Sequence, residues 1–179
     1  MKKLIVFGLA ITAAVMANAA SFDWKTSTTG KMQAVGGGNY TGTAYLIDAA
    51  ALSQSAAFTA LNSGTAASAL SSLASKSVSA GVISSGTQFT WGTAGDTLTA
   101  YVVIQDGDNF FISSTKSGMA DANSATTLQF ALKSDSSTAL NTSGSYSGAG
   151  WYGKAVPEPT SGLLMLVGLG ALALRRRRA

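Results

Sequence analysis

The chain has 179 residues, of which 46% are hydrophobic and only 11% are charged, and its formal net charge is +4. It contains no cysteine and no histidine, which excludes a disulfide scaffold, metal sites built from thiolates or imidazoles, and catalysis by Cys-His or Ser-His-Asp groups. The excess positive charge lies near the two ends, because six lysines and seven aspartates between Ser21 and Val156 nearly cancel, so no basic surface for nucleic acid is expected.

Residues 1–20 have the three regions of a secretory signal peptide. Lys2 and Lys3 give the positive start, residues 4–15 form an apolar run, and Ala17-Asn18-Ala19 supplies the small-x-small pattern that precedes a cleavage site. We therefore predict export, with cleavage by signal peptidase after Ala19 or Ala20. A buried N-terminal helix is the alternative interpretation of the same residues.

Residues 21–155, called the passenger, are predicted to be mainly β. Several segments rich in β-branched and aromatic residues are separated by Gly, Asn, Asp and Ser turns. They are 41–48, 87–91, 97–105, 109–114, 126–133 and 145–154. The clearest hairpin has its turn at Asp106-Gly107-Asp108. This pattern favours an antiparallel β-sandwich or a barrel-like fold.

One alanine-rich stretch, about residues 49–76, departs from the β pattern. Leu52, Ala56, Phe58 and Leu61 lie on one helical face, and Asn62-Ser63-Gly64 would end that helix. Thr65 could cap a second helix that runs to about Lys76. We therefore expect a helical hairpin inserted in the β domain, with a flexible Ala/Ser loop as the alternative.

The large aromatic side chains are the expected core anchors of the passenger. They are Trp91, Tyr101, Phe110, Phe111, Phe130 and Trp151. An alternative role is open for Trp91, Trp151, Tyr146 and Tyr152, since aromatic rings exposed on a sheet stack on sugar rings, although aromatic residues in strands are more often core.

Two short motifs could suggest chemistry, and each has a simpler explanation. Asp106-Gly-Asp108-Asn109 resembles part of a calcium loop but lacks the remaining ligand positions, so a hairpin turn explains it. Ser113-Ser-Thr-Lys116 matches the S-x-x-K pattern of serine penicillin-binding enzymes, yet it follows a strand and shares its lysine with the adjacent Lys116-Ser-Gly118. We therefore assign no catalytic, metal-binding or cofactor-binding residues.

Residues 156–179 contain three contrasting parts in a fixed order. Val156-Pro157-Glu158-Pro159-Thr160 must be extended, because proline lacks an N–H and disfavours helix in the residue before it. An uncharged run follows, from which we predict a short transmembrane helix at about 161–174. Arg175, Arg176, Arg177 and Arg178 should stay on the cytoplasmic side by the positive-inside rule.

This order of motif, apolar run and arginines resembles the PEP-CTERM sorting signal of exported proteins in Gram-negative bacteria that make exopolysaccharide. The resemblance covers only the C-terminal tail. It implies that an exosortase recognises Pro157, Glu158 and Pro159 and removes the tail after a transient stay in the inner membrane. It also implies a mature form at the cell surface or in the extracellular matrix.

The passenger is expected to be non-enzymatic, structural or adhesive, and associated with exopolysaccharide. One alternative is a carbohydrate-binding surface module with exposed aromatic residues. The other is a periplasmic protein that keeps its C-terminal anchor uncleaved.

Overall fold

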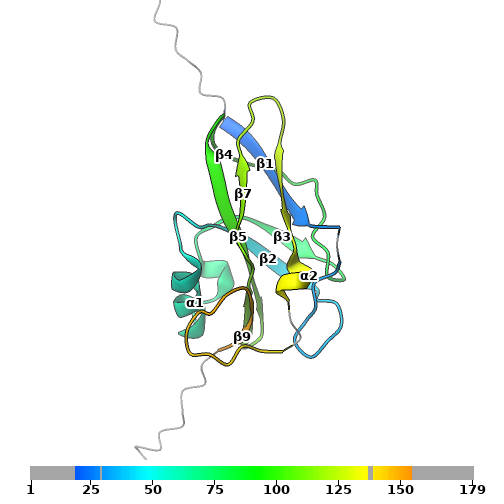
Figure 1. Ribbon diagram of the computed structural model, residues 1–179, viewed down its shortest axis with the longest axis vertical. Coiled ribbons are helices and arrows are strands. Elements are labelled where there is room, and N and C mark those ends of the chain that lie inside the picture. Colours follow the sequence, from blue (N-terminus) through cyan, green and yellow to red (C-terminus); the bar gives the residue numbers. More distant parts are fainter. Residues whose placement is uncertain (1–18, 29, 137–138, 155–179) are drawn as a thin grey trace, which may run out of the picture.

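The computed structural model describes residues 19–28, 30–136 and 139–154, which are called the folded body below. Its strands are β1 (Ala19–Thr26), β2 (Gly42–Asp48), β3 (Ser72–Val78), β4 (Phe89–Thr93), β5 (Thr97–Asp106), β6 (Asn109–Ile112), β7 (Lys116–Met119), β8 (Thr126–Phe130) and β9 (Gly150–Gly153). Its helices are α1 (Gln54–Asn62), the 3₁₀ turn η1 (Ala67–Ala69) and the short α2 (Leu132–Asp135). The body is elongated; β1 begins near one end of it, and β9 lies near the other (Figure 1).

The strands form two sheets, as expected for a β-sandwich. The smaller sheet has the order β4-β1-β8, and the larger has the order β3-β2-β5-β6-β9 with β7 also paired to β5. The ladders are antiparallel except that of β1 with β8, which is parallel. The expectation of a purely antiparallel sandwich is therefore wrong at this one pair.

The larger sheet is covered on both faces, because its side chains alternate between two cores. One core lies between the two sheets and contains Trp24, Val102 and Trp151. The other lies under α1 and contains Phe58, Tyr101 and Tyr152. The arrangement is thus three layers, with α1 packed on the outer face of the larger sheet.

The predicted hairpin around Gly107 is confirmed. Asp106 pairs with Asn109, so Gly107 and Asp108 form a two-residue loop between β5 and β6. Gly107 has φ +58°, a left-handed conformation that glycine adopts without steric cost. After β6 the chain rejoins β5 as β7, so the long β5 pairs with two successive strands.

The predicted helical hairpin at 49–76 is half right. The first helix is present as α1, with Ser53 as its N-cap and its end at Asn62, before Gly64 at φ +104°. The second helix is absent: η1 is a single turn, and β3 pairs with β2 along the edge of the larger sheet. Leu70 and Leu73 are three residues apart, but pairing to β2 overrides this weak helical pattern.

Two further sequence predictions need correction. The strand expected at 126–133 ends at Phe130, and α2 follows it. Trp91, an expected core anchor, is only half-buried and packs against the edge of the inter-sheet core. The other anchors, Tyr101, Phe110, Phe111, Phe130 and Trp151, are buried as expected.

Candidate functional site

Most residues predicted to direct export lie outside the described residues. These are Ala17, Pro157, Glu158, Pro159, Arg175, Arg176, Arg177 and Arg178, together with the helix predicted at about 161–174. Within the folded body no helix is long and apolar enough to cross a membrane.

The folded body reaches into the predicted signal-peptide cleavage region. Ala19 is exposed at the start of β1 and pairs with Thr93 across a register shift. Ala20 is only 1% exposed and belongs to the inter-sheet core. Cleavage after Ala19 would therefore keep the buried alanine, whereas cleavage after Ala20 would remove it.

The other end of the folded body is tightly held. Residues Gly150 to Gly153 pair with β6 on one side, and Asn141 makes an isolated bridge to Tyr152 on the other. The ladder continues beyond the strand, because the Lys154 N–H donates to the Asp108 carbonyl at 2.8 Å. The ordered contacts thus extend to the last described residue.

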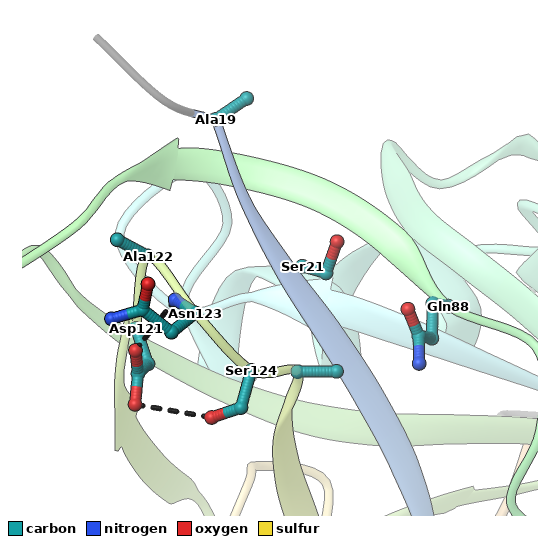
Figure 2. A pocket seen from close by; sticks show the side chains of 8 residues that line it. Ala19, Ser21, Gln88, Asp121, Ala122, Asn123 and Ser124 are labelled. Atoms are coloured by element: carbon teal, nitrogen blue, oxygen red, sulfur yellow. Dashed lines mark hydrogen bonds between the residues drawn. The ribbon is translucent and has the colours of Figure 1, made fainter.

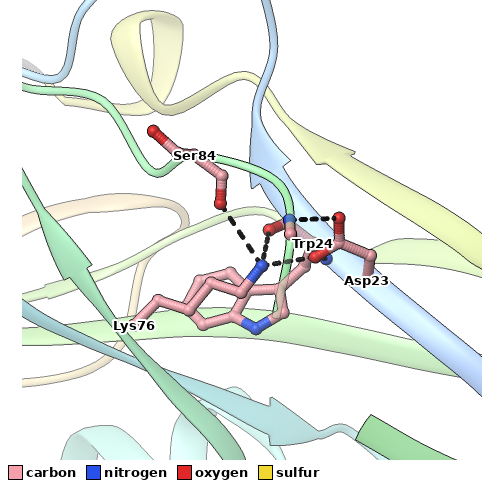
Figure 3. A network of polar contacts seen from close by, with 5 residues as sticks. Asp23, Trp24, Lys76 and Ser84 are labelled. Carbon is pink, nitrogen blue, oxygen red and sulfur yellow. Dashed lines mark hydrogen bonds and ion pairs between the residues drawn. The ribbon is translucent and has the colours of Figure 1, made fainter. Parts of the chain in front are cut away.

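A polar network, shown in Figure 3, joins the two sheets. Lys76 on β3 forms an ion pair with Asp23 on β1, and the two side chains are only 7% and 8% exposed. The Lys76 ammonium also donates to the carbonyls of Trp24 at 2.7 Å and Ser84 at 3.3 Å. It lies 5.6 Å from the centre of the Trp24 ring, within the range of a cation–π contact.

The carboxylate of Asp23 is held in its charged form. Burial raises the pKa of Asp23, but hydrogen bonds from Lys76 and from the Gly86 and Trp24 N–H groups, with the charge of Lys76, outweigh burial and lower it. The two backbone bonds measure 3.0 Å and 2.7 Å. Because each polar atom of this pair has protein partners, the network acts as a clamp between β1 and β3 rather than as a reactive site.

An open polar pocket lies near the start of β1, and Figure 2 shows its lining. It measures about 230 Å³, below the size typical of ligand pockets. Its only charged group is Asp121, whose carboxylate accepts bonds from the Asn123 N–H and the Ser124 hydroxyl; these bonds lower its pKa. The Asp121 carboxylate is therefore already hydrogen-bonded within its own turn, which argues against a binding site here.

A second pocket lies where the chain leaves the body. It measures about 240 Å³ and lies between the end of α1, residues 140–144, Gly153 and Lys154. Half-exposed Leu140 gives it an apolar wall.

The two short motifs have structural explanations. Asp106 and Asp108 are exposed on the β5–β6 turn, and the folded body contains no cluster of three acidic residues that could hold a metal. Ser113 is buried: its hydroxyl accepts the Val102 N–H at 2.8 Å and donates to the Ser114 carbonyl. It therefore bridges the gap in the β5 ladder between β6 and β7, while Lys116 is exposed.

The aromatic residues considered for sugar stacking face inward. Trp151 and Tyr152 are buried in the two cores, and Trp91 and Tyr146 are half-buried against them. In the folded body no large aromatic side chain is exposed. A carbohydrate-binding sheet face would present a row of exposed aromatic rings. These four residues do not form such a row.

Sequence reasoning missed the Asp23–Lys76 clamp. The two residues are 53 positions apart, and β3 was expected to be a helix, so nothing in the sequence placed them together. A weak signal was available, because Asp23 lies between the apolar residues Phe22 and Trp24 in a β-rich segment.

Comparison with known proteins bears on the C-terminal tail. A family model of the PEP-CTERM protein-sorting motif matches residues 155–178. No curated protein and no solved structure matches the chain. The match begins directly after Lys154, confirms the resemblance found in the sequence and implies processing by exosortase in a Gram-negative bacterium. The chain is therefore an exported protein that carries a PEP-CTERM sorting motif immediately after a two-sheet folded body.

Proposed function

We propose that the folded body is a structural or adhesive component of the cell surface or extracellular matrix, associated with exopolysaccharide. The observation that carries this proposal is the sorting motif at residues 155–178, which implies an exported substrate of exosortase. The inward placement of the aromatic rings supports a packing role for them over a sugar-binding role.

The composition fits a component that lasts outside the cell. The chain has no cysteine to oxidise or exchange, and its charged pair at Asp23 and Lys76 is shielded within the sandwich. A buried pair is screened by salt much less than an exposed one. In this proposal the mature protein is not an enzyme and needs no cofactor.

The route is tested by substitution in the motif. Glu158→Gln should leave full-length chain in the inner membrane, while Asp106→Asn, an exposed acid on a turn, serves as the matched control. Fractionation with intact-mass measurement follows both variants. An unchanged mature mass and location for Glu158→Gln would count against recognition through the motif, and a tail that persists in the wild type would favour the uncleaved anchored protein.

The matrix role is tested separately. Mature protein should remain with the matrix of a strain that makes exopolysaccharide and be lost to the medium in an otherwise identical strain that does not. Equal retention in both strains would contradict the association with exopolysaccharide and leave the export route intact.

A further inference from the structure

The pocket between the end of α1, residues 140–144 and the end of β9 differs in charge from the pocket near the start of β1. Its volume is about 240 Å³, and amide, hydroxyl and apolar groups line it. Among the described residues that line it, the single charged group is the Lys154 ammonium, and none is acidic. The pocket therefore favours a ligand that carries negative charge.

Lys154 is held at the wall of this pocket from two sides. Its backbone N–H donates to the Asp108 carbonyl at 2.8 Å. Its side chain passes over Gly64, just after α1, where a Cβ would lie 3.4 Å from the Lys154 ε carbon. The residue is half-buried, and within the folded body its ammonium forms no ion pair. A partly desolvated cation without an acidic partner is available to a ligand carboxylate.

The opposite wall is a loop that its own hydrogen bonds hold in place. The Asn141 N–H donates to the Trp151 carbonyl at 2.7 Å, and the Asn141 side-chain oxygen accepts the Ser143 N–H at 2.9 Å. Thr142 is exposed between them, and its hydroxyl has no partner within the folded body. Leu140, which is 37% exposed, adds an apolar surface. The loop thus offers a free hydroxyl beside an apolar wall.

We propose that this pocket binds one acidic sugar unit of a polysaccharide, with the sugar carboxylate paired to Lys154. The proposal names the ligand class within the association with exopolysaccharide proposed above, and it rests on that function. A sugar ring presents hydroxyl groups to Thr142 and C–H groups to Leu140. A neutral sugar leaves the Lys154 ammonium unpaired, so it binds more weakly. The volume suits one ring and not a longer stretch of polymer, since pockets for drug-sized ligands begin at about 300 Å³.

The two pockets differ in what their charged groups already bind. The Asp121 carboxylate is occupied by the Asn123 N–H and the Ser124 hydroxyl, whereas the Lys154 ammonium is free of acidic partners in the folded body. The proposed site also needs no exposed aromatic ring. It is therefore compatible with the inward placement of the rings in both cores.

The direct test titrates sodium glucuronate into ¹⁵N-labelled mature protein recovered from cells, followed by NMR. The backbone amides of Gly64, Thr142 and Lys154 should shift saturably, with a dissociation constant on the order of 1 mM. The Asn123 amide, at the pocket near β1, is the internal reference and should not shift. No saturable shift up to about twenty times that concentration would overturn the site.

Glucose and acetate are the matched ligand controls. Glucose has the ring without the carboxylate, and acetate has the carboxylate without the ring, so each should bind at least about tenfold more weakly than glucuronate. Binding of acetate as tight as that of glucuronate would overturn the assignment to a sugar. Binding of glucose as tight as that of glucuronate would overturn the role of the charge.

A pair of variants tests Lys154 itself. Lys154→Gln removes the charge and keeps the backbone N–H that donates to Asp108. It should weaken glucuronate binding about tenfold. Lys116→Gln removes a charge from an exposed position on β7 and should bind like the wild type. Equal affinities of the two variants would overturn the pairing with Lys154.

The same variants separate this site from the function on which it rests. Intact-mass measurement first selects mature chains with the same processing. In a strain whose exopolysaccharide contains acidic sugars, Lys154→Gln should be lost to the medium while Lys116→Gln and the wild type stay in the matrix. Retention of all three chains would overturn the site and leave the matrix association intact. Loss of all three would contradict the matrix association, and the titration with glucuronate then decides the site.

Discussion

Replacing Lys76 by methionine should strongly destabilise the folded body. The substitution keeps most of the side-chain volume but leaves Asp23 as a buried carboxylate that is 8% exposed. Removal of one partner from a buried ion pair costs 3–5 kcal/mol. Because the Gly86 and Trp24 N–H groups still bind Asp23, the loss should lie at the lower end, about 3 kcal/mol.

The assay is urea unfolding followed by tryptophan fluorescence. Trp24 is a suitable reporter, since its ring lies beside the Lys76 ammonium. For a body of this size the melting temperature should fall by about 10 °C. Lys116→Met is the matched control, because Lys116 is exposed on β7 and its loss should change stability by less than about 0.5 kcal/mol.

A double-mutant cycle separates the interaction energy between Asp23 and Lys76 from the effect of losing either side chain alone. Asp23→Asn in the Lys76→Met background removes the stranded charge, so the double variant should be more stable than Lys76→Met alone, with a coupling energy of about 2 kcal/mol. A Lys76→Met variant within about 0.5 kcal/mol of the wild type would refute the clamp. Additive effects of Lys76→Met and Asp23→Asn would also refute the clamp.

Three other predictions follow from burial and titration. Phe58→Ala should cost about 3–4 kcal/mol in urea unfolding, because Phe58 is 4% exposed and contacts the rings of Phe110 and Tyr152; a loss below about 1 kcal/mol would contradict the packing of α1 as a stabilising layer. Burial raises the pKa of Tyr146 to about 12 and also raises that of Tyr101, so stability present below about pH 10 should be lost as the pH rises toward 12. Tyr146→Phe should weaken that alkaline loss, as followed by circular dichroism. N-terminal sequencing of the mature protein should begin at Ala20, which the core retains, and a start at Ser21 would contradict this.

The parts of the fold that sequence patterns predicted are those with strong local signals. The β5–β6 hairpin depends on a glycine turn between two apolar segments, and α1 has a serine cap and a glycine after its end. Both features act within a few residues. The sorting motif was found for the same reason, since its three parts are contiguous.

The parts that were missed depend on distant partners. β3 has a composition of serine, alanine and leucine that suits several conformations, and its pairing with β2 decides among them. β1 contains Asp23, whose buried carboxylate is paired with Lys76 from the other sheet. No local pattern encodes either contact, so the clamp and the parallel pairing of β1 with β8 follow only from the assembled fold.

β9 joins the two cores of the folded body. Side chains alternate along a strand, so the adjacent Trp151 and Tyr152 enter opposite cores. Both cores are therefore incomplete until the last strand is in place. Any interaction that strengthens the docking of β9 should thus stabilise the folded body.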